Sequence, residues 1–97
     1  MITIQDIISY SKPHPVTNGK VTRLSNDKVI ISIVGGVSGL YGDFEKDFEV
    51  AIFDKNTDEF ITKFFRPDNT DDVIPYMPSK DVEELVNQIL HNGFQVL

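Results

Sequence analysis

The strongest fold signal in the chain is a nearly continuous apolar run, Lys28-Val29-Ile30-Ile31-Ser32-Ile33-Val34. β-Branched residues favour strands, and a strand that is apolar at successive positions is typical of one covered on both faces. We therefore predict a central strand over 28–34. The turn-forming residues 25–27 lie before it, and the moderately alternating residues 20–24 are expected to form the preceding strand.

The composition extends this prediction to the whole chain. Its 97 residues include 11 Ile, 10 Val and 7 Phe but a single Ala, a set that favours sheet over helix. With 40% hydrophobic and 25% charged residues, we expect one folded domain spanning 1–97. The chain has no Cys, which excludes disulfides and thiolate metal sites. It also has neither a secretory signal nor an apolar run near the roughly 20 residues of a membrane span, so we expect a cytoplasmic protein.

Two further strands and two helices complete the predicted fold. Residues 48–53 and 60–65 are expected to pair as a hairpin. Pro75 and Pro78 are expected to frame an extended connector that carries Ile74, Tyr76 and Met77. Thr3 and Asp6 predict a capping box at the start of a short N-terminal helix. Ser79 is expected to cap a C-terminal helix with one apolar face, which Gly93 ends. The order α-β-β-β-β-α with short links indicates an α+β fold, a four-stranded mainly antiparallel meander with both terminal helices packed on it.

No stretch of the chain carries a recognised catalytic, metal or cofactor motif. The glycine-rich residues 35–43 lack the spacing of a phosphate-binding loop, and a protein-binding loop is the more plausible functional interpretation. Residues 54–58 resemble the opening of a calcium loop, but Glu59 stands where glycine is needed, and a polar turn is favoured. His14 and His91 have no partner arrangement for catalysis. We therefore expect no cofactor, no metal and no enzymatic activity.

Charge is the most informative functional feature. The net charge is −6, yet residues 1–42 carry +2 and residues 43–97 carry −8. An acidic surface repels phosphates, so direct nucleic-acid binding is not expected. Four carboxylates alternate along residues 43–49 and would share one side if this segment were extended. Solubility alone could explain this charge. The candidate partner-binding residues are Tyr41, Asp43, Glu45, Asp47 and Glu49.

Several segments resemble small accessory proteins encoded by tailed bacteriophages. The similar segments are Ser32-Ile33-Val34-Gly35-Gly36, Gly39-Leu40-Tyr41-Gly42-Asp43, Phe48-Glu49-Val50-Ala51-Ile52-Phe53, Phe60-Ile61-Thr62 and Asp71-Asp72-Val73-Ile74. They cover roughly residues 32–90. The resemblance implies an accessory role during infection, in the host cytoplasm, and assigns no site residue.

These observations lead to one main functional hypothesis and two alternatives. The main hypothesis is a small acidic, non-enzymatic protein that binds and modulates or inhibits a host protein, for example one that handles nucleic acid. The first alternative is a self-associating structural or assembly protein, because an open sheet edge and surplus apolar groups could pair with a second copy. Those groups are Phe64, Phe65, Ile74, Tyr76 and Phe94. The second alternative is a small enzyme with an unrecognised site.

Overall fold

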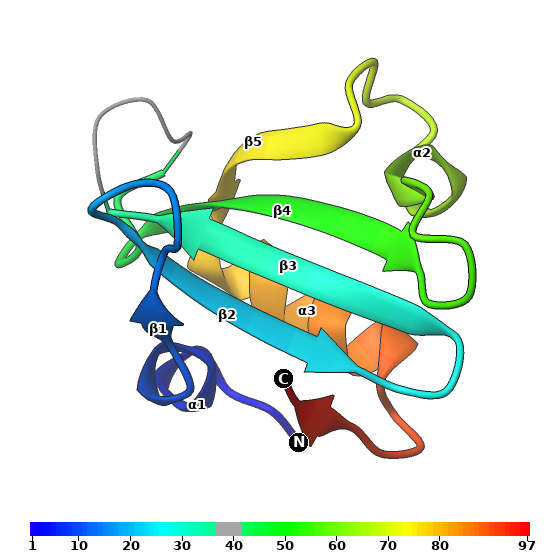
Figure 1. Ribbon diagram of the computed structural model, residues 1–97, viewed down its shortest axis with the longest axis horizontal. Coiled ribbons are helices and arrows are strands. Elements are labelled where there is room, and N and C mark those ends of the chain that lie inside the picture. Colours follow the sequence, from blue (N-terminus) through cyan, green and yellow to red (C-terminus); the bar gives the residue numbers. More distant parts are fainter. Residues whose placement is uncertain (37–41) are drawn as a thin grey trace.

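The computed structural model describes residues 1–36 and 42–97, which form an antiparallel sheet backed by helices (Figure 1). In chain order the elements are α1 (Ile4–Ser9), β1 (Lys12–Pro13), β2 (Lys20–Ser25), β3 (Val29–Gly35), β4 (Asp47–Asp54), α2 (Thr62–Phe65), β5 (Val73–Pro78), α3 (Ser79–Ile89) and β6 (Gln95–Val96). The predicted α+β class is confirmed. The predicted strand number is wrong, because six strands rather than four are found among these residues.

The central position of β3 is confirmed. The strand order is β1-β2-β3-β4-β5, with β6 pairing on β2, and every one of these pairs is antiparallel. Every residue of β3 is buried except Ser32, which is partly buried. Because successive residues of a strand point to opposite faces, both faces of β3 are covered.

The hydrophobic core lies between one face of the sheet and the helices. Figure 1 shows α3 crossing behind the sheet, with α1 beside it. The core side chains with no exposed area are Ile7, Leu24, Ile31, Ile33, Phe48, Val50, Ile52, Val82, Leu85 and Val86. They come from α1, from the three middle strands and from the predicted apolar face of α3. The terminal helices therefore pack on the sheet as expected.

Polar contacts tie the N-terminal helix to the rest of the fold. The predicted capping box is present: Thr3 Oγ1 accepts a hydrogen bond from Asp6 N at 3.1 Å, and Asp6 Oδ2 accepts one from Thr3 N at 3.0 Å. The buried Thr22 hydroxyl donates to the carbonyl of Ile7 at 2.7 Å, which joins α1 to β2. The Asn87 side-chain amide bonds both backbone groups of Ile2, which joins the N-terminus to α3.

Residues 60–65 do not form the predicted strand. Phe60 makes a single antiparallel bridge with Phe53, and the chain then turns into α2. The reason is Thr62, whose buried Oγ1 accepts the hydrogen bond of Ile52 N at 3.0 Å. A side chain thus takes the position that a backbone carbonyl of a neighbouring strand would hold, and the ladder ends there.

The proline-containing segment 73–78 is the edge strand β5 rather than a connector. It pairs with β4 through Phe48↔Met77 and Val50↔Ile74, with a register irregularity between the two pairs. Proline is tolerated at a sheet edge because its missing N–H is not needed for a ladder hydrogen bond. Pro75 and Pro78 therefore do not prevent this strand from forming.

The opposite edge of the sheet is covered by two short strands. β1 pairs with residues 20–21 of β2, and β6 pairs with residues 24–25. The C-terminal segment thus folds back onto the sheet. Gly93 adopts a φ of 124°, as its position after the helix predicts, but Ser79 is the first residue of α3 and makes no side-chain cap. No helix within 1–36 and 42–97 is long and apolar enough to cross a membrane.

Candidate functional site

The predicted binding segment forms a tight turn rather than an extended strand. Asp43 Oδ1 accepts hydrogen bonds from the backbone N–H groups of Glu45 and Lys46, each at 2.8 Å, and from that of Asp47 at 3.3 Å. Asp47 Oδ1 in turn accepts from Asp43 N at 2.9 Å. The condition under which the four carboxylates would share one side is therefore not met, since β4 begins only at Asp47.

Burial of one aromatic ring explains this turn. Phe44 has a φ of 63° and is 3% exposed, and its ring packs edge-on against Phe48 with centroids 5.2 Å apart. Gly42 makes the close approach possible, because a Cβ there would lie 2.6 Å from Phe48 Cα. Residues 43–47 therefore form a turn rather than an extended strand, and this turn places the Phe44 ring in the core.

The five candidate residues consequently have different roles. Tyr41 lies outside the described residues. The backbone N–H groups of Lys46, Glu45 and Asp47 lower the pKa of the Asp43 carboxyl below its usual value. Asp43 is thus the hydrogen-bond acceptor of the turn, with Asp47 as its reciprocal partner. Glu45 is exposed to solvent.

Glu49 stands apart from the turn, on the sheet face opposite α3. It is paired with Val34 in the ladder and is partly buried. This burial raises the pKa of the Glu49 carboxyl, and the charge of nearby His14 opposes the rise. When the His14 ring is neutral, its Nδ1 accepts from the backbone N–H groups of Val16 and Thr17, each at 3.2 Å, which leaves the proton on Nε2.

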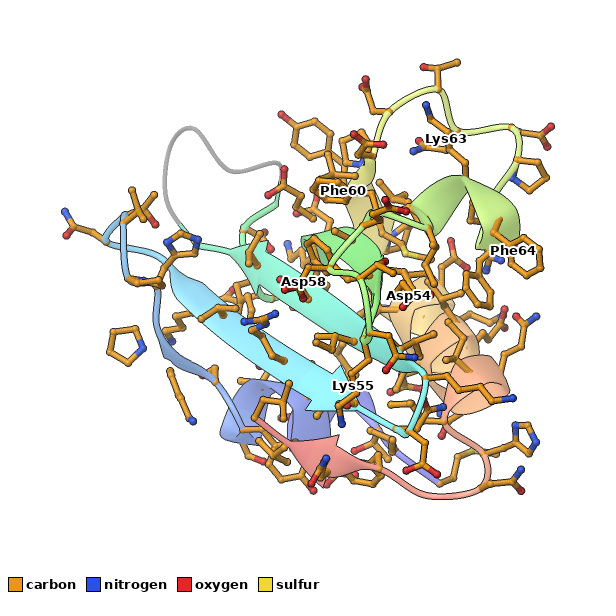
Figure 2. The ribbon with its side chains drawn as sticks, turned by 45° about the vertical axis from the view of Figure 1, so that its right-hand side comes forward. Asp54, Lys55, Asp58, Phe60, Lys63 and Phe64 are labelled. Atoms are coloured by element: carbon orange, nitrogen blue, oxygen red, sulfur yellow. The ribbon has the colours of Figure 1, made fainter. Side chains whose placement is uncertain are left out.

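A second surface lies at the other end of β4, and we call it the aromatic corner: Phe53, Phe60, Phe64 and Phe65. Phe60 is 46% exposed and its ring lies 4.6 Å from that of Phe53. Phe64 is 83% exposed and contacts Phe65 edge-on at 5.4 Å, and Phe65 packs against the core. In Figure 2 the Phe64 ring projects outward from α2, and Phe60 lies apart from it.

Backbone hydrogen bonds hold the turn beside this corner in one shape. Asp54 Oδ1 accepts from the backbone N–H groups of Asn56 at 2.8 Å and Thr57 at 3.1 Å. Asp54 N donates to the carbonyl of Glu59 at 2.8 Å, and Asp58, with a φ of 60°, donates to the carbonyl of Asp54 at 2.9 Å. The prediction of a polar turn is confirmed.

The surroundings of the aromatic corner are acidic. Residues 54–72 contain six acids and three bases. Lys55 Nζ donates to the carbonyl of Asn26 at 3.2 Å, and Arg66 Nη1 donates to that of Phe65 at 2.8 Å, so two of the bases are directed to backbone groups. The six acids are Asp54, Asp58, Glu59, Asp68, Asp71 and Asp72. All of them except Asp54 are exposed.

Metal-ligand groups and cavities are the next features of the described residues. No group of three or more His, Asp or Glu side chains among them could hold a metal ion. An open hollow of about 540 Å³ lies where the 25–28 turn meets the C-terminal segment, and its lining includes Asp27, Lys28, His91 and Phe94. Within the described chain this lining contains one carboxylate, Asp27, whereas a carboxylate acid–base pair needs two.

Sequence reasoning identified only part of the aromatic corner. Phe64, Tyr76 and Phe94 are exposed, as expected for surplus apolar groups, whereas Phe65 and Ile74 pack against the core. The sequence predicts Phe60 as the first residue of a strand over 60–65, and nothing in its local pattern indicates that the ladder stops beside it.

No family model, curated protein or solved structure matches this chain.

Proposed function

We propose that this protein is a small, non-catalytic binding protein that engages another protein through the aromatic corner. The observation that carries the proposal is Phe64, a large apolar ring that is 83% exposed on an element held by buried hydrogen bonds. Exposed aromatic rings are costly in water and are enriched at the energetic centres of protein interfaces. A rigid support lowers the ordering cost of binding.

The charge of the surface favours a basic partner. The corner lies within the acidic part of the chain, and the exposed Glu45 adds to the charge at the opposite end of β4. Such a surface accelerates encounters with basic proteins and disfavours acidic ones. A nucleic-acid-handling protein has the required basic groove, where the carboxylates would stand in for phosphates. The proposed setting is the host cytoplasm, with the protein modulating or inhibiting a host factor as a phage-type accessory protein.

Self-association is the second candidate, and the same exposed rings favour it. Pairing through sheet edges is the less favoured route, because β1 and β6 cover the free side of β2 and β5 carries Pro75 and Pro78. Apolar packing of Phe64 against a second copy would bring together two acidic surfaces. Like charges oppose this contact.

A capture experiment tests the proposal. Tagged protein is incubated with bacterial host lysate at about 50 mM and about 300 mM salt, a change that shortens the Debye screening length by about 2.4-fold. The wild type is compared with Phe64→Ala and with the control Val16→Ala. The control shortens an apolar side chain that is 86% exposed but has no aromatic ring. We expect one partner that the wild type and the control retain, that Phe64→Ala loses and that the higher salt weakens.

The same preparation tests the alternative. Sedimentation at micromolar concentration should show a monomer for the wild type. A defined multimer that Phe64→Ala converts to monomer would favour self-association. A partner captured equally by all three proteins would show that the aromatic corner is not the binding surface.

A further inference from the structure

Phe60, in the aromatic corner, combines an exposed aromatic ring with a carboxylate at the same end of the molecule. The Phe60 ring lies against Phe53, with centroids 4.6 Å apart and planes inclined by 36°, and nearly half of Phe60 remains exposed. Phe53 therefore supports one side of a ring whose remainder is open to a ligand. Two residues before it, the exposed Asp58 carboxylate lies at the same end of the molecule, as Figure 2 shows.

An aromatic ring and a carboxylate at the same end of the molecule suit a planar cation. A guanidinium group stacks on a ring face and directs its N–H fork toward a carboxylate, whereas an ammonium group is a compact, strongly hydrated point charge. Arginine therefore gains from both features of this site, and lysine gains chiefly from the charge.

The turn holds the backbone that carries this carboxylate in one conformation. Asp58 adopts the left-handed conformation at φ 60°, and its N–H is bonded to the Asp54 carbonyl at 2.9 Å. The Lys55 ammonium bonds the Asn26 carbonyl at 3.2 Å. Preorganisation reduces the entropy that a ligand must overcome on binding.

We propose that the aromatic corner recognises an arginine side chain on a basic protein partner, with the guanidinium stacked on Phe60 and paired with Asp58. This arginine-binding role rests on the proposed function, and it specifies which basic side chain of the partner protein is recognised. Charge complementarity selects this occupant, because residues 54–72 carry six acids and three bases. A second copy of the chain would bring the same excess of negative charge to the contact.

The test uses two defined peptides and purified full-length protein. One is a short fluorescein-labelled peptide in which arginine alternates with leucine and glycine; the other has lysine at every arginine position. Binding is followed by fluorescence anisotropy at about 50 mM salt. We expect the arginine peptide to bind about two- to fivefold more tightly, the ratio that an exposed cation–π contact supplies.

Matched variants locate the preference. Phe60→Leu keeps an apolar side chain on Phe53 but removes the ring, and Asp58→Asn removes the charge while keeping a residue that tolerates the left-handed backbone. Their controls are Phe94→Leu, another partly exposed ring, and Glu84→Gln, an exposed carboxylate on α3. Both corner variants should lower the arginine-to-lysine ratio toward one, and both controls should leave it unchanged.

Other results would overturn the assignment. Equal binding of the two peptides would do so, as would a preference that depends on Phe94 or a concentration-dependent dimer that Phe64→Ala abolishes. Chemical-shift mapping of the wild type with the arginine peptide gives a test without variants, since Phe60 and Asp58 should shift and Phe94 should not. A lysate partner that depends on Phe64 without arginine preference would leave the proposed function standing, and the absence of any such partner would remove it.

Discussion

Replacing Thr62 by valine should destabilise the fold and loosen the aromatic corner together. Thr62 is 1% exposed, and its Oγ1 accepts from Ile52 N at 3.0 Å and donates to the Asp72 carbonyl at 2.6 Å. Valine has nearly the same shape but no hydroxyl. Both backbone groups would therefore lose their partner without the creation of a large cavity.

The two lost hydrogen bonds do not have equal weight. Ile52 has no exposed area, so its N–H would remain buried and unpaired, at a cost of about 1–3 kcal/mol. Asp72 is exposed, and water can replace the hydroxyl at its carbonyl, which reduces that term to about 0.5–1 kcal/mol. We expect a loss of about 2–3 kcal/mol in the free energy of unfolding. For a domain of this size that lowers Tm by about 10–20 °C.

Urea unfolding followed by far-UV circular dichroism measures this loss, because the chain contains no Trp. The matched control is Thr62→Ser, which keeps the hydroxyl, removes one buried methyl and should cost about 1 kcal/mol. Because α2 begins at Thr62 and carries Phe64, the valine variant should also bind its partner less well below its unfolding transition. A valine variant as stable as the serine variant would refute the hydrogen-bond argument.

Four further predictions rest on burial, charge and close packing. Phe64→Ala should change stability by less than about 0.5 kcal/mol, while Phe48→Ala, at a side chain with no exposed area, should cost about 3–5 kcal/mol in the same urea assay. Backbone hydrogen bonds lower the pKa of the Asp43 carboxyl, so its charge stabilises the fold at pH values above the unfolded pKa. This contribution disappears as the pH falls through the folded pKa. Asp43→Asn should therefore be less stable than the wild type at pH 7 and equally stable in strong acid. Desolvation raises the pKa of the Glu49 carboxyl, so its charge destabilises the fold at pH 7. Glu49→Gln should therefore be more stable than the wild type at pH 7, and this gain in stability should be absent below the unfolded pKa of the carboxyl. Gly42→Ala should cost about 1–3 kcal/mol in thermal melts, because its Cβ would lie 2.6 Å from Phe48 Cα and the backbone must move; an unchanged melting temperature would contradict this packing argument.

Elements specified by neighbouring residues could be predicted without coordinates. The apolar run of β3 predicts its central place, and the Thr3–Asp6 pair predicts the capping box. The spacing of Val82, Leu85 and Val86 predicts the face that α3 buries. In each case the residues that determine the structure lie within one or two turns, or within one strand, of each other. Local pattern is sufficient for such elements.

The partner of β4 could not be predicted this way. Residues 60–65 have the stronger strand composition, yet the segment with two prolines occupies the sheet edge. This choice depends on long-range contacts: Met77 packs in the core beside Phe48, and the Thr62 hydroxyl ends the competing ladder. Strand propensity carries no information about either contact.

The candidate site, too, has features that the sequence determines and features that only the fold determines. Composition and charge placement are properties of the chain, and they determined that its second part would be acidic and that it contained more large apolar side chains than a small core uses. Only the folded structure decided which of them remain outside, because exposure depends on residues distant in sequence. Phe44 and Phe64 show this plainly, because each directly follows a charged residue in the sequence. Phe44 is nevertheless 3% exposed and Phe64 is 83% exposed. The first enters the core where Gly42 allows the backbone to approach β4. The second projects from a helix that is held against the sheet by the Thr62 hydroxyl, by a backbone hydrogen bond from Ile61 to Ile52 and by the packing of Phe65.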